Sequence, residues 1–379
     1  MKQIDWKQAP SPSFVVDERL LKRNLELLKS VQDRTGGDIL LALKGFSMWS
    51  TFPMARDYLK GITSSSLFEA RLGYEEFGKE VHAYAPAYAD YEIDEYLKYV
   101  DHIVFNSFDQ LARHKEKVQA QAKHISIGLR VNPGYSEVET PLYDPCYLHS
   151  RPRIPFESFK PEELDGVEGI HFHAMCEQNA DVLERILVHF EEKYGEYLHQ
   201  MKWVNFGGGH HITREDYDVE LLIKLINRIQ HTYDVKVILE PGEAIALNTG
   251  YLVATVLDTV KNGMDLAILD TSATCHMPDT LEMPYRPMII GSGLPNEKKY
   301  TYRLGGMTCL AGDVIGDYSF DEPLKAGDRL VFTDMAHYTM VKTHMFNGVN
   351  LPSICLYNEE EGVKVVRTFQ YEDYRNRLS

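Results

Sequence analysis

The chain lacks several features that define common classes of protein. It has no apolar stretch long enough to span a bilayer, so we expect no membrane partner. Positive charge is scarce, with 40 Lys and Arg against 56 Asp and Glu, for a net charge of −16. This disfavours a nucleic-acid partner, because phosphate binding requires a basic face. Only five cysteines occur in 379 residues, which indicates free thiols in a reducing compartment.

Two further absences narrow the location and the fold. The first six residues, Met1 to Trp6, contain no apolar segment of the secretory type, so we predict a cytoplasmic protein. No early Gly-x-Gly-x-x-Gly turn appears, which disfavours an open doubly wound sheet. A chain of 379 residues is too long for one ordinary core, which favours two domains.

Short apolar runs alternate with amphipathic helical stretches through the first two thirds of the chain. Eight parallel strands with helices between them are typical of a (β/α)8 TIM-like barrel, which we predict over residues 13–247. The eight predicted strands are residues 39–43, 61–65, 81–85, 102–105, 125–131, 169–173, 203–206 and 235–240. The predicted helices are residues 48–59, 68–77, 91–99, 108–121, 181–201 and 219–233.

Beyond residue 247 the pattern changes to short β-branched runs separated by Gly, Pro and Asp. We predict a second, mostly antiparallel β domain over residues 248–379, joined by residues 1–12. Its predicted strands are residues 251–260, 266–270, 288–290, 300–304, 329–333 and 363–369. Within the barrel region, residues 134–166 are rich in Pro, Tyr and Arg, which favours an ordered lid or binding loop.

The lysine at the end of the first barrel strand is the most informative residue. Lys44 follows an apolar run, where a lysine is costly unless its amine is neutralised or used. Desolvation lowers the pKa of such an amine and makes it a nucleophile suited to Schiff-base chemistry. The alternative is a lysine that extends from the strand end into solvent.

Other unusual groups fall at the same end of the predicted barrel, where functional residues of such barrels gather. Gly207, Gly208 and Gly209 follow the seventh strand and form either a phosphate cradle or a flexible turn. Glu240 ends the eighth strand, where it either keeps a pyridine nitrogen protonated or is a paired core acid.

Two histidines, His171 and His173, end the sixth strand on one side of it. One could stack on an aromatic cofactor while the other is a satisfied core histidine. With Glu240 they could also bind zinc, but zinc leaves Lys44 and the glycines unexplained, so we predict no metal. A lysine, a phosphate cradle and a carboxylate for a ring nitrogen are the groups that pyridoxal 5′-phosphate (PLP) requires.

Specific strings carry a resemblance to a known family. The strings are Ala42-Leu43-Lys44-Gly45-Phe46-Ser47, Tyr143-Asp144-Pro145-Cys146, Cys275-His276-Met277-Pro278-Asp279, Leu281-Glu282-Met283-Pro284-Tyr285-Arg286-Pro287 and Cys309-Leu310-Ala311-Gly312-Asp313. Over nearly its whole length the chain resembles the fold-type III PLP-dependent decarboxylases, which have a barrel and a β domain. The last three strings are most similar to those of the carboxynorspermidine (carboxyspermidine) decarboxylases.

The resemblance implies a role for individual residues. It implies that Lys44 binds PLP as a Schiff base, His173 stacks on the ring, Gly207, Gly208 and Gly209 hold the phosphate, Glu240 pairs with the ring nitrogen, and Tyr338 contacts the phosphate. Cys309 would return a proton after CO2 leaves, and Asp313 would lie close by and help hold the substrate. The cysteine loop comes from the partner subunit in this family, which implies a homodimer with shared sites.

Cys309 could be a small buried hydrophobe, whereas we interpret the remaining four cysteines as structural. These are Cys146, Cys176, Cys275 and Cys355. The loop around Cys309 favours a functional role for that residue instead.

One position departs from the ornithine-type pattern, which has an arginine where this chain has Glu243. A carboxylate there repels phosphate, but with Asp279 and Glu282 it could form an acidic pocket for the amines of a carboxylated polyamine. The alternative is that Glu243 is a solvated loop acid.

The predicted reaction is decarboxylation of carboxynorspermidine or carboxyspermidine to norspermidine or spermidine. One alternative is a decarboxylase of another diamino acid, such as diaminopimelate or ornithine. An alanine racemase would favour arginine at the ring nitrogen, where this chain has Glu240. A non-catalytic homologue that sequesters a partner subunit would lack Lys44 or Cys309. A zinc hydrolase remains a further alternative.

Overall fold

The computed structural model describes residues 4–147 and 149–379, which form two compact units. The barrel unit comprises Lys22–Ile245, and the β unit comprises the described residues up to Leu21 together with Ala246–Ser379. The sequence placed the first boundary before residue 13, nine residues earlier. The difference arises because strand β1 (Ser13–Asp17) pairs with two strands of the β unit rather than with the barrel.

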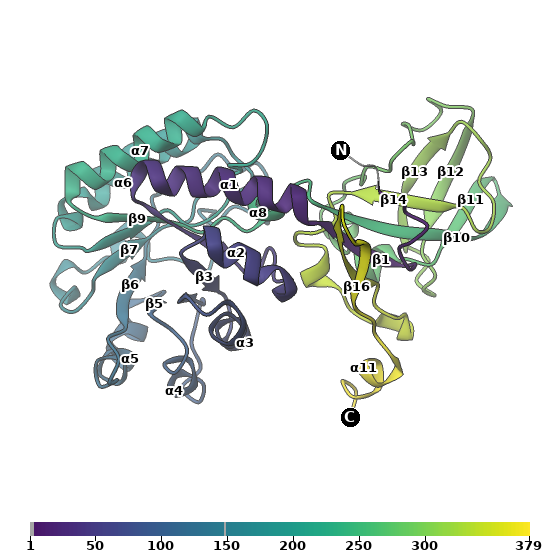
Figure 1. Ribbon diagram of the computed structural model, residues 1–379. Coiled ribbons are helices and arrows are strands. Elements are labelled where there is room, and N and C mark those ends of the chain that lie inside the picture. The colour runs from purple at the N-terminus through teal and green to yellow at the C-terminus, as the bar shows by residue number, and fades with distance from the viewer. Residues whose placement is uncertain (1–3, 148) are drawn as a thin grey trace. The chain divides into compact units, whose positions relative to one another are not determined.

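The barrel unit contains a closed barrel of eight strands, with helices around it in Figure 1. All neighbouring strands are parallel, which confirms the predicted barrel. The strands are β2 (Asp38–Ala42), β3 (Gly61–Ser64), β4 (Glu80–Tyr84), β5 (His102–Phe105), β6 (Ser126–Arg130), β7 (Gly169–His171), β8 (Trp203–Asn205) and β9 (Lys236–Leu239).

Helices connect successive strands, and short polar residues cap several of them. Ser107 accepts a hydrogen bond from the amide of Gln110 at the start of α5, and Asp218 accepts one from Leu221 at the start of α7. The helices of this part of the chain are α1 (Glu18–Thr35), α2 (Phe52–Tyr58), α3 (Leu67–Leu72), α4 (Ile93–Tyr96), α5 (Phe108–Gln119), α6 (Ala180–Leu198), α7 (Val219–Tyr233) and α8 (Glu243–Ala246). No helix in the described part of the chain combines the length and apolarity needed to cross a membrane.

Trp203, the first residue of β8, fills the barrel interior. A Cβ atom on Gly128 would lie 2.3 Å from the Trp203 ring, and one on Gly169 would lie 2.1 Å from it. Both glycines therefore leave space that the indole occupies. The indole nitrogen donates a hydrogen bond of 2.9 Å to the Ser126 hydroxyl, so its polar atom is satisfied despite burial.

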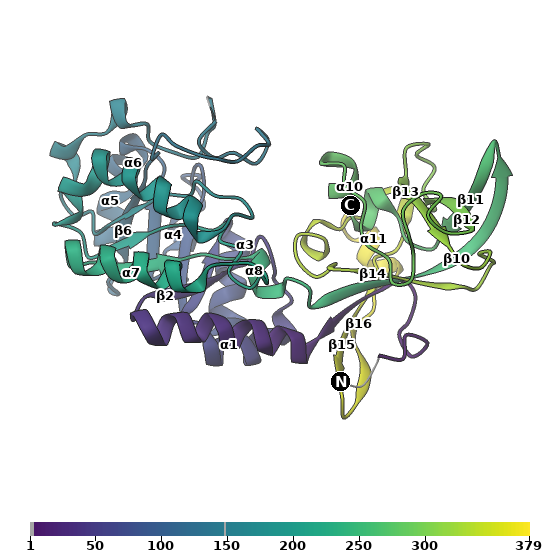
Figure 2. The ribbon, with the colours of Figure 1, turned by 90° about the horizontal axis from the view of Figure 1, so that it is seen from above.

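The β unit is built on an eight-stranded sheet whose long, curved strand β10 is visible in Figure 2. Apart from the parallel pairs β1–β15 and β11–β12, neighbouring strands are antiparallel, as predicted. The strands after β1 are β10 (Gly250–Asn262), β11 (Met264–Leu269), β12 (Tyr300–Gly305), β13 (Val314–Phe320), β14 (Arg329–Thr333), β15 (Ser353–Asn358) and β16 (Gly362–Arg367). The sequence analysis missed β1, β13 and β15, and residues 288–290 form only an isolated bridge through Ile289.

The long connection over residues 134–166 contains two 3-10 helices, η3 (Phe156–Ser158) and η4 (Pro161–Glu163). A bridge between Val131 and Ile154 ties it to the end of β6. Its role as a lid or binding loop stays a prediction.

Candidate active site

A pocket at the C-terminal ends of the barrel strands brings together residues singled out in the sequence. Lys44, His171, His173, Gly208 and Glu240 all line it. Its other lining residues are Ala42, Thr63, Ser64, Ser65, Tyr84 and Arg130. The strand ends therefore converge as the parallel barrel predicts.

Lys44 stands in the turn directly after β2, and its side chain is exposed to the open pocket that it lines. Desolvation by the surrounding protein lowers its pKa, and the nearby charge of Arg130 lowers it further. A larger fraction of the amine is then neutral and nucleophilic. Arg130 is 7% exposed, and its guanidinium lies 4.3 Å from the centre of the Tyr84 ring.

Glu240 is buried and held by two neighbours. Its Oε1 atom accepts a hydrogen bond of 2.8 Å from the amide of Asn205, and its Oε2 atom lies 3.5 Å from His171 Nε2. Burial alone would raise the pKa of Glu240, but His171 and the Asn205 hydrogen bond outweigh it, so the pKa is lowered. The site therefore contains a buried, ionised carboxylate.

The three glycines form a tight turn that admits no side chain. Gly207 and Gly209 have φ of +69° and +83°, and a Cβ on Gly209 would lie 2.1 Å from the Met175 carbonyl oxygen. The amide of Gly207 donates to Asn205 Oδ1 and that of Gly208 donates to His173 Nδ1, each at 2.8 Å. Two of the three glycine amides are thus engaged by side chains. Gly209 is the glycine whose amide has no partner among the described residues.

The two histidines of this region have different surroundings. His173 Nδ1 accepts the Gly208 hydrogen bond, so in the neutral ring Nε2 carries the proton. Desolvation lowers the pKa of His173 well below its usual value, so this ring is neutral, and it lowers that of His171 to about 3 although the Glu240 carboxylate opposes the shift. Neither nitrogen of His171 has a hydrogen-bond partner within the described part of the chain. The expectation that one of the two is a satisfied core histidine is therefore wrong for His171.

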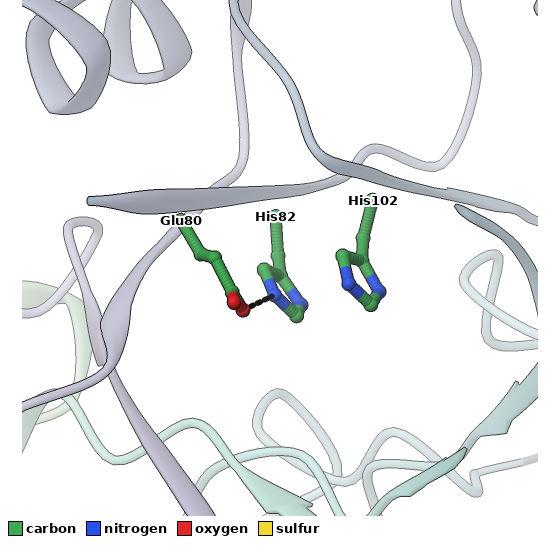
Figure 3. A group of neighbouring side chains, drawn as sticks. All are labelled: Glu80, His82 and His102. Atoms are coloured by element: carbon green, nitrogen blue, oxygen red, sulfur yellow. Dashed lines mark hydrogen bonds and ion pairs between the residues drawn. The ribbon is translucent and has the colours of Figure 1, made fainter. Parts of the chain in front are cut away.

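The alternative zinc site is not formed. Among the described residues, the group of three close enough to share an ion is Glu80, His82 and His102, at the start of β4 and β5 (Figure 3). The two rings lie on neighbouring strands and stack at 3.8 Å with planes 9° apart. Their nitrogen lone pairs lie in nearly parallel planes and do not converge on one point. Lys60 lies 2.9 Å from a Glu80 oxygen, so these residues form a packed, ion-paired cluster.

Asp313 and Cys309 lie in the β unit. The Asp313 carboxylate is buried and accepts hydrogen bonds from Ser272 Oγ at 2.9 Å, the Ala273 amide at 2.8 Å and Thr308 Oγ1 at 2.6 Å. It thereby ties the segment before Cys309 to the start of helix α9 (Ala273–His276). Both Asp313 oxygens accept hydrogen bonds from these segments, so the residue holds the loop around Cys309 in place. The sequence did not indicate this role. All five cysteines are free thiols, as predicted, and Cys309 is exposed.

Asp279 and Glu282, two of the predicted acidic residues, open and close helix α10 (Asp279–Glu282) of the β unit. Lys342 Nζ forms an ion pair with Asp279 Oδ1 and lies 3.5 Å from Glu282 Oε2. Tyr338 is in the same unit, with a left-handed backbone at φ 49°.

Glu243, the third predicted acid, belongs to the barrel unit and begins helix α8. Its side chain is 18% exposed, and its Oε1 atom lies 3.4 Å from His211 Nε2. Glu243 is therefore a partly buried, paired carboxylate rather than a solvated loop acid.

Sequence reasoning missed three polar residues that build the barrel site. Tyr84, Arg130 and Asn205 are the last residues of β4, β6 and β8. His171 occupies the same position on β7. The sequence signal that could have identified them is a polar residue close to the C-terminal end of each predicted strand.

The residues present suit the cofactor predicted from the sequence. A lysine of lowered pKa, a neutral ring and a buried carboxylate line one pocket. The three-glycine turn lies beside them, and its neighbours leave no room for a Cβ atom. The set fits an aromatic aldehyde that carries a phosphate and a basic ring nitrogen.

Comparison with known proteins agrees with this assignment. Residues 13–336 match the family described as "Pyridoxal-dependent decarboxylase, C-terminal sheet domain". A carboxynorspermidine/carboxyspermidine decarboxylase of Campylobacter jejuni is 44% identical to this chain, over 98% of this chain and 99% of its own length. A carboxyaminopropylagmatine decarboxylase of Synechocystis is 46% identical over 97% of this chain and 95% of its own.

The fold has an experimental counterpart of the same kind. The crystal structure of a carboxynorspermidine decarboxylase from Campylobacter jejuni, complexed with norspermidine, matches this structure with a TM-score of 0.90 at 44% identity. The match covers 97% of this chain and 99% of that one.

Proposed function

The chain belongs to the pyridoxal-dependent decarboxylases, within the carboxynorspermidine/carboxyspermidine decarboxylase family, and from this premise we propose which substrate it uses and which residues act. Its cofactor is PLP. The proposed substrates are carboxynorspermidine and carboxyspermidine, with norspermidine and spermidine as products. The observation that carries the proposal is the pocket that unites Lys44, His173, Gly208 and Glu240, in a chain 44% identical to a decarboxylase of these substrates.

Four parts of the chain are proposed to hold the cofactor. Lys44 would bind its aldehyde carbon, and the neutral His173 ring would pack against its face. Gly207, Gly208 and Gly209 allow close approach of the backbone to the phosphate, where Gly209 has the amide best placed to donate. Tyr338 provides a further contact to the phosphate.

The bound cofactor accepts the electron pair released when a carboxylate leaves as CO2. Glu240 holds a proton at the ring nitrogen, since an ionised carboxylate raises the affinity of a neighbouring nitrogen for a proton. The Asn205 hydrogen bond fixes that carboxylate in place, and His171 lies 3.5 Å from its other oxygen. The lowered pKa of Lys44 favours its neutral amine, the form that would bind the cofactor and that a substrate amine could replace. Cys309 returns a proton to the α-carbon from its exposed thiol.

Three acidic residues are proposed to recognise the cationic arm of the substrate. Glu243 in the barrel unit and Asp279 and Glu282 in the β unit bear carboxylates suited to ammonium groups. Asp313 acts on the substrate indirectly, by ordering the segment that carries Cys309.

A second candidate substrate is carboxyaminopropylagmatine. The observation that favours it is the Synechocystis relative of that name, at 46% identity. A guanidinium at the end of the arm would then replace an ammonium, and planar bidentate contacts to a carboxylate would set the preference.

We further propose that the enzyme is a homodimer with shared sites, in which Cys309 serves the partner subunit. Exposed apolar side chains of the β unit support an interface there. They are Tyr285, Met288, Ile290, Leu294, Met307 and Leu310. Mixing the Lys44→Ala and Cys309→Ala proteins tests the sharing, because mixed dimers regain one intact site. A mixture as inactive as either parent would contradict it.

The reaction is tested by CO2 release from PLP-loaded protein. The substrates are carboxynorspermidine, carboxyspermidine, carboxyaminopropylagmatine, ornithine and diaminopimelate, with Lys44→Ala as the control. Release from the carboxylated polyamines, lost in the control, is the expected result, and it ranks the three. Release only from ornithine or diaminopimelate would overturn the substrate proposal. No release from any substrate would favour a non-catalytic homologue.

A further inference from the structure

We propose that Lys342 is a specificity-determining residue that acts as a resident counter-ion. Its ammonium occupies the acidic pair Asp279 and Glu282, and an ammonium group of the substrate displaces it on binding. This inference rests on the proposed function, since it takes Asp279 and Glu282 as the residues that meet the cationic arm.

The contacts within the β unit define the arrangement. Lys342 ends the short 3-10 helix η5 (Met340–Lys342), and its Nζ atom pairs with Asp279 Oδ1 while lying 3.5 Å from Glu282 Oε2. Among the described residues, no other cationic side chain forms an ion pair with either acid. Lys342 therefore neutralises two carboxylates that stand one helical turn apart.

Exposure makes this ion pair exchangeable. The side chains of Lys342, Asp279 and Glu282 are 32%, 23% and 59% exposed. Water thus reaches all three groups, and an ion pair of this exposure is weak. Lysine also has a long flexible stem, so its ammonium can withdraw while the backbone of η5 stays in place.

The exchange sets a charge requirement on the incoming group. An ammonium that replaces Lys342 preserves the charge balance at the two acids. A group that carries both an amine and a carboxylate, such as the far end of diaminopimelate, brings no net charge and cannot replace it. A neutral arm would leave the lysine in place. Lys342 therefore disfavours the binding of such arms. Without Lys342, the two carboxylates would discriminate less between arms of different charge.

The test compares Lys342→Met with Lys298→Met in the PLP-loaded protein. Lys298 pairs with Asp321 at 2.6 Å and is 25% exposed, which makes it a matched lysine of the same unit. Removing the resident ammonium should lower the KM for carboxynorspermidine and the inhibition constant of norspermidine by about two- to fivefold. This is the change in affinity that the free energy of an exposed ion pair corresponds to. Lys342→Arg should leave both near the wild-type values, as should Lys298→Met.

The selectivity and the structural alternative have separate readouts. Loss of Lys342 should weaken discrimination against diaminopimelate as an inhibitor, and a purely structural ion pair would instead lower thermal stability without changing that discrimination. A KM that rises or stays constant in Lys342→Met overturns the inference. Should the methionine variant fail to fold, Lys342→Gln gives the same comparison.

Asp279→Asn separates failure of this inference from failure of the proposed function. If Asp279→Asn leaves the KM for carboxynorspermidine unchanged, the acidic pair does not bind substrate and the proposed pocket is wrong. If Asp279→Asn raises the KM but Lys342→Met does not lower it, the pocket stands and the counter-ion role is wrong. In the double variant, the effect of Lys342→Met should be smaller than in the wild-type background, because the two residues act on one contact.

Discussion

Replacing His102 with phenylalanine should make the stability of the protein less sensitive to acid. His102 stacks on His82 at 3.8 Å and packs 5.4 Å from the Trp203 ring. Desolvation is the main cause that lowers the pKa of His102 to about 2, and the charge of His82 lowers it further. Glu80 opposes this shift, while His124 and Lys60 add to it.

The sign and size follow from proton binding. An unfolded histidine has a pKa of about 6.5 and gains a proton below that pH, whereas folded His102 stays neutral down to about pH 2. Acid therefore favours the unfolded chain, and the stabilisation present above pH 6.5 is lost as the pH falls. Between pH 7 and pH 5 the loss from this one group is about 2 kcal/mol.

Urea unfolding of wild type and His102→Phe at pH 7 and pH 5 measures this difference. The variant should lose about 2 kcal/mol less than wild type over that interval. Buried histidines that do not contact His102 contribute equally to both proteins and cancel. His231→Phe is the control, because His231 is exposed and is not among the groups that shift the pKa of His102. Equal pH dependence of wild type and His102→Phe would refute the reasoning.

Three other substitutions test the site. Gly209→Ala should weaken PLP binding at least tenfold, measured by cofactor titration, because its Cβ would lie 2.1 Å from the Met175 carbonyl and its φ is +83°. Glu240→Gln should lower kcat by about two orders of magnitude while PLP still binds, as absorbance and steady-state kinetics will report. Asp313→Ala should destabilise the β unit by about 1–3 kcal/mol and lower kcat, because its hydrogen-bond donors lose their acceptor. Wild-type stability in Asp313→Ala would contradict its ordering role.

The periodic part of the fold was predictable because parallel barrel strands are buried on both faces and appear as short apolar runs. All eight barrel strands lie where those runs were found. Strand β13 was missed because its polar and small residues hide the β pattern. The first domain boundary shifted because the pairing of β1 with β10 joins residues more than 230 positions apart, which local pattern cannot indicate.

The candidate site was predictable where a residue was costly in its sequence context, as with Lys44 and Glu240. It was not predictable where the role depends on one side chain meeting another. Asn205 links Glu240 to the Gly207 amide through contacts that no spacing rule reveals. The role of Asp313 could not be predicted for the same reason, because its hydrogen-bond donors come from a segment about 40 residues earlier as well as from its own loop.

The indole of Trp203 makes three distant positions of the chain interdependent. Its ring occupies the volume that side chains at residues 128 and 169 would otherwise take, with Cβ positions only 2.3 and 2.1 Å from it. A larger residue at either glycine is therefore tolerated only together with a smaller one at 203. Across relatives these positions should vary as a set, and exchanging the set as a whole is the route to resizing the barrel beneath the site.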